Sequence, residues 1–165
     1  MTLDVGCGRN PRGDVNVDVS SSLADVLCDA QALPFKTGSF DRVLSYHCIE
    51  HCPDPAKMLG EMLRVGRKVK FWTDDVHWPG RYLHYVFKRG QCVGTEHCMA
   101  WTRRYMENWL RLLRVERWSV RNVLLPSSPA FGFLRKLMWL FVAWPLSLMG
   151  IKPTIEVEIC RDSGY

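Results

Sequence analysis

The residues that first suggest chemistry stand at the start of the chain, which reads Leu-Asp-Val-Gly-Cys-Gly over residues 3–8. A short apolar run that ends in Gly-x-Gly favours a strand followed by a tight turn, because glycine leaves space where a Cβ would obstruct a ligand. Asp4 places an acid in front of this turn. Such turns also occur for purely structural reasons, so this segment alone is weak evidence for a nucleotide-type ligand.

Two more aspartates stand at the ends of expected strands: Asp18 ends the run 14–18, and Asp29 follows the run 26–28. In an open α/β sheet, the carboxyl ends of the strands form the edge where ligands bind. There Asp18 can accept hydrogen bonds from both hydroxyls of a ribose, and Asp29 with the N–H group of Ala30 can bind the edge of a base. Taken singly, a strand-end aspartate can equally cap a turn.

Two histidines, His47 and His51, follow the fourth expected strand, 41–45. A neutral imidazole near pH 7 suits a general base, so both are candidate catalytic residues. For His51 we favour the competing interpretation, in which it packs and hydrogen-bonds at the start of the next helix. For His47 the catalytic and the structural interpretations are balanced.

Apolar periodicity predicts the elements that must position these residues. Short β-type runs are separated by turn residues, and one helix opens at Asp54-Pro55, where an N-cap precedes a first-turn proline. Strands that alternate with crossovers predict an α/β fold with a parallel sheet. The expected strands are 3–5, 14–18, 26–28, 41–45, 69–73, 118–125 and 154–160, and a second helix is expected over 101–113.

Two segments depart from this pattern. Residues 74–100 are rich in aromatic residues and predict an insertion or lid over an acceptor pocket, or else a second small hydrophobic core. Residues 137–151 carry no charge, but they are too few for a membrane span and include Pro145. We interpret 137–151 as an interfacial or substrate-covering segment, with packing onto the sheet as the alternative.

Composition sets the broad class of the protein. A chain of 165 residues with 47% hydrophobic residues is long enough for one domain with its own core. The net charge of +5 is spread along the chain, so we predict no nucleic-acid partner. Seven cysteines with irregular spacing and no CxxC pair favour reduced thiols and a cytoplasmic protein.

The motifs in order resemble the class I S-adenosylmethionine-dependent methyltransferases, most closely the small-molecule branch called methyltransferase type 11. The resemblance covers about residues 2–75 and rests on Asp-Val-Gly-Cys-Gly, Val-Asp, Asp-Ala-Gln-Ala-Leu-Pro-Phe, Ser-Phe-Asp-Arg-Val and Glu-His-Cys-Pro-Asp-Pro. It implies a Rossmann-like, doubly wound α/β sheet, mostly parallel with a reversed last strand, in a single domain over 1–165. The fold would be shortened at the N-terminus, because the chain opens directly on a strand and residues 9–17 are too few for the usual crossover helix.

The same resemblance implies S-adenosyl-L-methionine as cofactor and assigns a part of it to each motif. The glycine turn would line the methionine portion, the acid after the second strand would hold the ribose, and the acid after the third would hold the adenine. Ser45 would lie on the sulfonium side, and Asn10 replaces the third glycine of the usual turn. The implied cofactor-binding residues are Asp4, Gly6, Cys7, Gly8, Asp18, Asp29, Ala30 and Ser45.

Two metal interpretations compete with the role of a base. The segment His47-x-x-Glu50-His51 resembles the acid-x-x-Glu-His metal segment of ubiquinone-type O-methyltransferases, but a histidine in first place favours a softer ion or none. The second interpretation requires neighbouring residues of one turn to converge on a zinc ion, which they seldom do. We therefore predict no metal site. The residues of the second interpretation are His47, Cys48, His51 and Cys52 with Cys92, His97 and Cys98.

The expected function is methyl transfer to a small, apolar or lipid-linked acceptor. The alternative is a catalytically inactive, methyltransferase-like binding or regulatory module. Either form could contact a membrane peripherally through 137–151 and its flanking Arg135-Lys136. The Asn/Asp-Pro-Pro-Tyr/Phe segment usual in base- and amide-methylating relatives is absent after the fourth strand.

Overall fold

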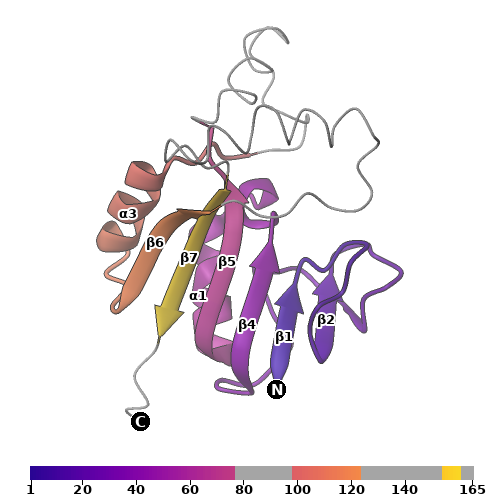
Figure 1. The fold of residues 1–165 in the computed structure, drawn as a ribbon. Coiled ribbons are helices and arrows are strands. Elements are labelled where there is room, and N and C mark those ends of the chain that lie inside the picture. Colours follow the sequence, from indigo (N-terminus) through magenta and orange to yellow (C-terminus); the bar gives the residue numbers. More distant parts are fainter. Residues whose placement is uncertain (77–97, 124–153, 161–165) are drawn as a thin grey trace, which may run out of the picture.

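The computed structural model describes residues 1–76, 98–123 and 154–160. In these ranges seven strands form one sheet with the order β3-β2-β1-β4-β5-β7-β6 (Figure 1). Neighbouring strands are parallel except at β7, which runs antiparallel to both β5 and β6. The predicted mostly parallel sheet with a reversed last strand is confirmed.

The elements agree closely with those expected from the apolar pattern. One difference is β5, which begins three residues before the expected run because Arg67 and Lys68 are exposed and interrupt that pattern. The strands are Thr2–Val5 (β1), Val15–Asp18 (β2), Val26–Leu27 (β3), Phe40–Tyr46 (β4), Gly66–Asp74 (β5), Trp118–Val123 (β6) and Thr154–Cys160 (β7). The helices are the 3-10 turn Ile49–His51 (η1), Pro55–Val65 (α1) and Arg103–Leu112 (α3).

Helix α1 begins as the sequence predicts. The Asp54 carboxylate accepts a hydrogen bond from the N–H group of Lys57 at 3.0 Å, and Pro55 occupies the first helical turn. Both features satisfy or remove N–H groups that a helix start leaves without partners. The helix therefore starts at a fixed point just after the candidate histidines.

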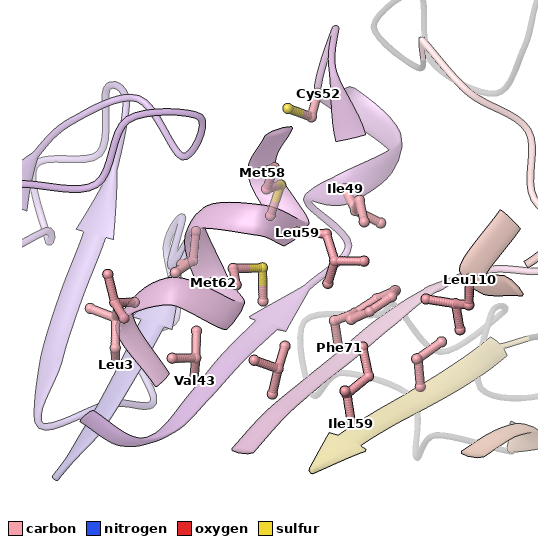
Figure 2. Packing of buried hydrophobic residues seen from close by; sticks show 14 of the residues in the cluster. Leu3, Val43, Ile49, Cys52, Met58, Leu59, Met62, Phe71, Leu110 and Ile159 are labelled. Atoms are coloured by element: carbon pink, nitrogen blue, oxygen red, sulfur yellow. The ribbon is translucent and has the colours of Figure 1, made fainter. Parts of the chain in front are cut away.

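The main core lies between the sheet and the helices α1 and α3 (Figure 2). Alternate residues of β5 and β7, among them Phe71 and Ile159, face this core, and α1 adds Leu59 while α3 adds Leu110. All four side chains are at most 1% exposed. Their burial supplies most of the free energy that holds the sheet and the two helices together.

The opposite face of β5, β6 and β7 carries polar and aromatic side chains. The buried Glu156 carboxylate accepts from the indole N–H of Trp72 at 2.9 Å and pairs with Lys70 and Arg121. Burial acts to raise the pKa of Glu156, but the bonds from Arg121 and Trp72 and the charge of Lys70 outweigh it and lower the pKa. The strict alternation of β7 thus separates an apolar from a charged face.

The connection between β1 and β2, residues 6–14, contains no helix, as its length predicted. Hydrogen bonds hold it instead: Asp14 exchanges two with Thr2, and the Asp4 carboxylate accepts one from the N–H group of Arg12 at 2.9 Å. A Cβ on Gly13 would lie 2.5 Å from the carbonyl oxygen of Val15 and 2.8 Å from the nitrogen of Asp4. Only glycine lets the chain pass this close to β1.

Most of the predicted insertion at 74–100 and all of the apolar segment 137–151 lie outside the described residues, so the single-domain interpretation of 1–165 stays a prediction. At the described end of the insertion, the carbonyl of Glu50 accepts from the N–H groups of Cys98 and Met99. Trp101, only 1% exposed, forms a β-bridge with Asp75. Among the described helices, none is long and apolar enough to cross a membrane.

We expect Gly13→Ala to lower the free energy of unfolding by about 1–3 kcal/mol, because its methyl group must displace backbone atoms. The matched control is Gly60→Ala, within helix α1, where an added Cβ meets nothing within 4 Å. The control should raise stability by about 0.5–1 kcal/mol through helix propensity. Urea unfolding measures both, and equal effects of the two changes would contradict the packing described for 6–14.

Candidate cofactor and acceptor site

The glycine turn after β1 is tied to β2 by its backbone. The N–H groups of Gly6 and Cys7 both donate to the carbonyl of Val17, at 2.8 and 3.0 Å. Gly6 (φ +73°) and Gly8 (φ +53°) adopt the left-handed conformation that favours glycine. A Cβ on Gly6 would lie 2.3 Å from Sγ of Cys48, whereas one on Gly8 would meet nothing within 4 Å. Gly6 is thus required for packing, and Gly8 borders open space that a ligand can enter.

Asp4 carries a buried acceptor without a partner. Its side chain is fully buried, Oδ2 accepts from the N–H group of Arg12, and Oδ1 has no hydrogen-bond partner within the described part of the chain. Burial raises the pKa of the Asp4 carboxyl, and the N–H group and charge of Arg12 offset this only in part. Buried carboxylate oxygens normally have donors. Oδ1 therefore fits a cationic or N–H donor of a ligand, such as the ammonium group of a methionine portion.

Asp18 links the glycine turn to the end of β2. Oδ2 accepts from the N–H group of Gly8 at 3.0 Å, and Oδ1 accepts from those of Ser20 and Ser21 at 2.9 and 3.0 Å. Burial alone would raise the pKa of Asp18, but these backbone donors outweigh it and lower the pKa. The carboxylate is ionised and fixed in orientation. Because each carboxylate oxygen has two lone pairs, Oδ2 can accept a further hydrogen bond from a hydroxyl.

Asp29 follows β3 at the same edge of the sheet as Asp18, because Leu27 pairs with Asp18 in the β2–β3 ladder. Its exposed carboxylate accepts from the backbone N–H group of Gln31 at 2.8 Å, which together with the Gln31 side chain lowers the pKa of Asp29. Ala30 is half-buried against the core. The two predicted adenine-binding residues thus stand beside the predicted ribose-binding residue.

The end of β4 brings three polar groups together. His47, directly after β4, has φ +48°, and its Nδ1 lies 3.3 Å from Oε1 of Glu50 and 3.5 Å from Oδ1 of Asp74. Glu50 is buried, and its Oε2 accepts from the hydroxyl of Thr73 at 3.0 Å. Burial acts to raise the pKa of Glu50, but the hydrogen bond and charge of His47 outweigh it and lower the pKa.

Sequence reasoning missed Asp74 as a member of this group. The signal in the sequence was the pair Asp74-Asp75 at the end of β5. This strand pairs with β4, and His47 directly follows β4. His51, in contrast, lies at the exposed end of η1, where its carbonyl accepts from the thiol of Cys98 at 3.4 Å. The structure thus joins His47 to Glu50 and Asp74, and it leaves His51 outside their group.

The thiol and hydroxyl groups near the site are largely buried. Ser45, at the end of β4, is 1% exposed, and Cys7 in the glycine turn is 3% exposed. Burial raises the pKa of Cys48 to about 12, although the Ser45 hydroxyl acts in the opposite direction. A thiol with this pKa stays protonated near neutral pH. Cys92 and His97, which the larger zinc interpretation also needs, lie outside the described residues.

Comparisons with known proteins agree with this geometry. A family model described as a methyltransferase domain matches residues 3–69. Ajmaline N-methyltransferase of Rauvolfia serpentina is 54% identical over 37 residues, which make up 22% of this chain. That match spans 13% of the length of the curated relative.

Two solved structures show the same fold over nearly the whole chain. A SAM-dependent methyltransferase of Thermotoga maritima, described as a possible histamine N-methyltransferase, has a TM-score of 0.69 at 14% identity and covers 98% of this chain and 82% of its own. Geranyl diphosphate C-methyltransferase of Streptomyces coelicolor was solved with Mg²⁺, geranyl diphosphate and S-adenosyl-L-homocysteine. Its TM-score is 0.62 at 14% identity, with 98% of this chain and 71% of its own chain covered.

A sheet of this order with a reversed β7 defines the Rossmann-like class I methyltransferase fold. The match to the methyltransferase-domain model over residues 3–69, which hold the glycine turn and the strands that follow it, agrees with this fold. Solved structures of this fold include complexes with S-adenosyl-L-methionine and with S-adenosyl-L-homocysteine.

We expect Asp4→Asn to separate stability from cofactor binding. A pKa raised in the folded state means that Asp4 favours folding at low pH and that this contribution is lost as the pH rises through the raised pKa. The asparagine variant lacks that loss, so at pH 7 it should be at least as stable as the wild type while binding cofactor more weakly. Urea unfolding between about pH 4 and 7, the range over which carboxyl groups titrate, measures the stability. Calorimetric titration with the cofactor measures the binding. A variant that unfolds more easily at pH 7 would show a structural role only.

Proposed function

We propose that the protein transfers a methyl group from S-adenosyl-L-methionine to a small-molecule acceptor that is apolar or lipid-linked. The observation that carries the proposal is the buried Oδ1 of Asp4, which has no hydrogen-bond partner in the described ranges, together with the open space at Gly8. An unsatisfied buried carboxylate oxygen is costly unless a ligand donor satisfies it. Asp18 at the same edge supplies the second charged acceptor that an adenosine-bearing cofactor requires.

In this proposal the residues around the turn bind and orient the cofactor. Gly6, Cys7 and Gly8 line the methionine portion, with Asp4 accepting from its ammonium group. When bound, the cofactor supplies the electrophilic methyl group, so the protein contributes alignment and exclusion of water. Asp18 accepts from the ribose hydroxyls, Asp29 and Ala30 contact the adenine, and Ser45 lies on the sulfonium side.

An acceptor that arrives protonated must lose its proton. Of the two histidines expected to serve it, we propose that turnover depends on His47. The support is its place directly after β4, two residues beyond Ser45, and its side chain, which is 39% exposed and faces two carboxylates. His51 is exposed at the end of η1 and has its carbonyl bonded to Cys98.

The apolar character of the acceptor rests on the sequence of 137–151, which lies outside the described residues. Fifteen uncharged residues with two tryptophans exceed what a short helix needs to cover a sheet edge. Support also comes from a relative of the same fold that was solved with geranyl diphosphate, an acceptor with an apolar chain. We therefore propose that 137–151 forms a lid over an apolar acceptor or a surface that contacts a bilayer.

We expect S-adenosylmethionine or S-adenosylhomocysteine to bind the wild type in the micromolar range and to raise its melting temperature. Asp18→Ala should remove most of this binding, because hydrogen bonds to a charged acceptor are worth about 1.5–3 kcal/mol each. Glu107→Gln, at a partly exposed acid on α3 that pairs with Arg103, is the control and should bind as the wild type does. If the wild type shows neither heat nor a melting shift at millimolar cofactor, the inactive binding module becomes the better account.

We expect the double change Trp139→Glu and Trp144→Glu to leave cofactor binding intact and to reduce acceptor turnover or liposome association. Two charges in the middle of 137–151 make it unsuitable for covering an apolar molecule or entering a bilayer interface. Calorimetry with the cofactor and flotation with liposomes measure the two effects separately. If the variant unfolds, the segment is part of the core and the lid proposal is wrong.

A further inference from the structure

His47, Glu50 and Asp74 form a group whose nitrogen and oxygen atoms all lie within 4.8 Å of one another. They come from three elements: the residue after β4, the turn η1 and the end of β5. Sequence reasoning weighed a different set, with His51 in the place of Asp74, and predicted no metal. In the structure, Asp74 at the end of β5 takes the place that the sequence interpretation gave to His51.

The distances within the group are long for hydrogen bonds and are also compatible with a ligand set. Nδ1 of His47 lies 3.3 Å from the Glu50 oxygen and 3.5 Å from the Asp74 oxygen. Charge-assisted N–H···O bonds are about 2.7–2.9 Å long, and one ring nitrogen has a single proton to donate. Ligand atoms placed about 2.0–2.2 Å from a tetrahedral zinc ion lie about 3.3–3.5 Å apart. The octahedral geometry of Mg²⁺ would bring them to about 3.0 Å.

We propose that His47, Glu50 and Asp74 bind a divalent cation of the zinc type, with a further coordination position left for another ligand. The support around the ligands fits this: the Thr73 hydroxyl orients Glu50, and the carbonyl of Trp72 fixes the backbone of His47 by accepting its N–H group at 2.9 Å. A cation also offsets the charge of Glu50, which is only 1% exposed. The left-handed backbone of His47 is a strained conformation of the kind found at functional sites.

His47 is the most exposed member of the group, so we place the further coordination position on its side, at the sheet edge where the proposed function has the acceptor bind. The role of the cation rests on the proposed function: it would bind the oxygen, nitrogen or sulfur atom of the acceptor and lower the pKa of that group. His47 would then contribute to turnover as a ligand. Cation binding itself needs neither cofactor nor acceptor, so the two proposals can fail separately.

The test is calorimetric titration of the full chain, freed of metal by a chelator, with Zn²⁺ alone. We expect one ion per chain, with affinity reduced about tenfold or more by His47→Ala and by Asp74→Asn. His51→Ala is the matched control and should bind Zn²⁺ within about twofold of the wild type. Asp74 is partly exposed, so its asparagine variant should fold even where a change at the buried Glu50 does not.

Cobalt(II) distinguishes this site from binding by the cysteines, because thiolate ligands give an intense near-ultraviolet charge-transfer band that nitrogen and oxygen ligands lack. A cobalt complex without that band, lost in Asp74→Asn, supports the proposal. It is overturned if the wild type binds no ion, if thiolate bands appear, or if Asp74→Asn and His47→Ala bind as the wild type does. In each of those outcomes cofactor binding still reports independently on the proposed function.

Discussion

Two carboxylates, rather than a helix, hold the glycine turn after β1 in place. In Rossmann-type folds this turn usually leads into a helix whose N-terminal N–H groups face the ligand. The connection 6–14 has no helix, and instead Asp18 accepts from Gly8 and Asp4 accepts from Arg12. The position of the turn at the sheet edge, and with it the proposed cofactor site, depends on these two bonds together with the backbone bonds from Gly6 and Cys7 to Val17.

The part of the sheet that stabilises the fold differs from the part that carries the proposed binding groups. Its apolar face packs on α1 and α3, where Phe71 and Leu110 are fully buried. The groups that we propose to bind ligands gather at the carboxyl edge instead, where β1, β2, β3, β4 and β5 end. The cost of burying charge at this edge, at Asp4 and at Glu50, is offset elsewhere by the core, so Oδ1 of Asp4 can stay without a hydrogen-bond partner among the described residues.

Local patterns in the sequence predicted most of the fold, and they also indicated the residues that we propose for the cofactor side of the site. The glycine turn, the strand-end acids Asp18 and Asp29 and the Asp54 cap are each readable within a few residues, because strand ends and helix starts have local signatures. The missing helix between β1 and β2 followed from the length of the connection alone.

The acceptor side could not be read in the same way. Asp74 lies far from His47 in the sequence, and only the pairing of Tyr46 with Trp72 in the β4–β5 ladder brings the two strand ends together. The early start of β5 was also hidden, because the exposed Arg67 and Lys68 interrupt the apolar pattern that a buried strand shows. Register between strands decides both features, and register follows from long-range pairing.

The most direct measurement of the central claim is a crystal structure of the chain with S-adenosylhomocysteine. The account predicts the ligand's ammonium group within hydrogen-bonding distance of Oδ1 of Asp4, its ribose hydroxyls on Asp18 and its chain across Gly8. A ligand that binds elsewhere, or a structure in which residues 9–13 fill the space at Gly8 and leave no room for the ligand, would contradict it.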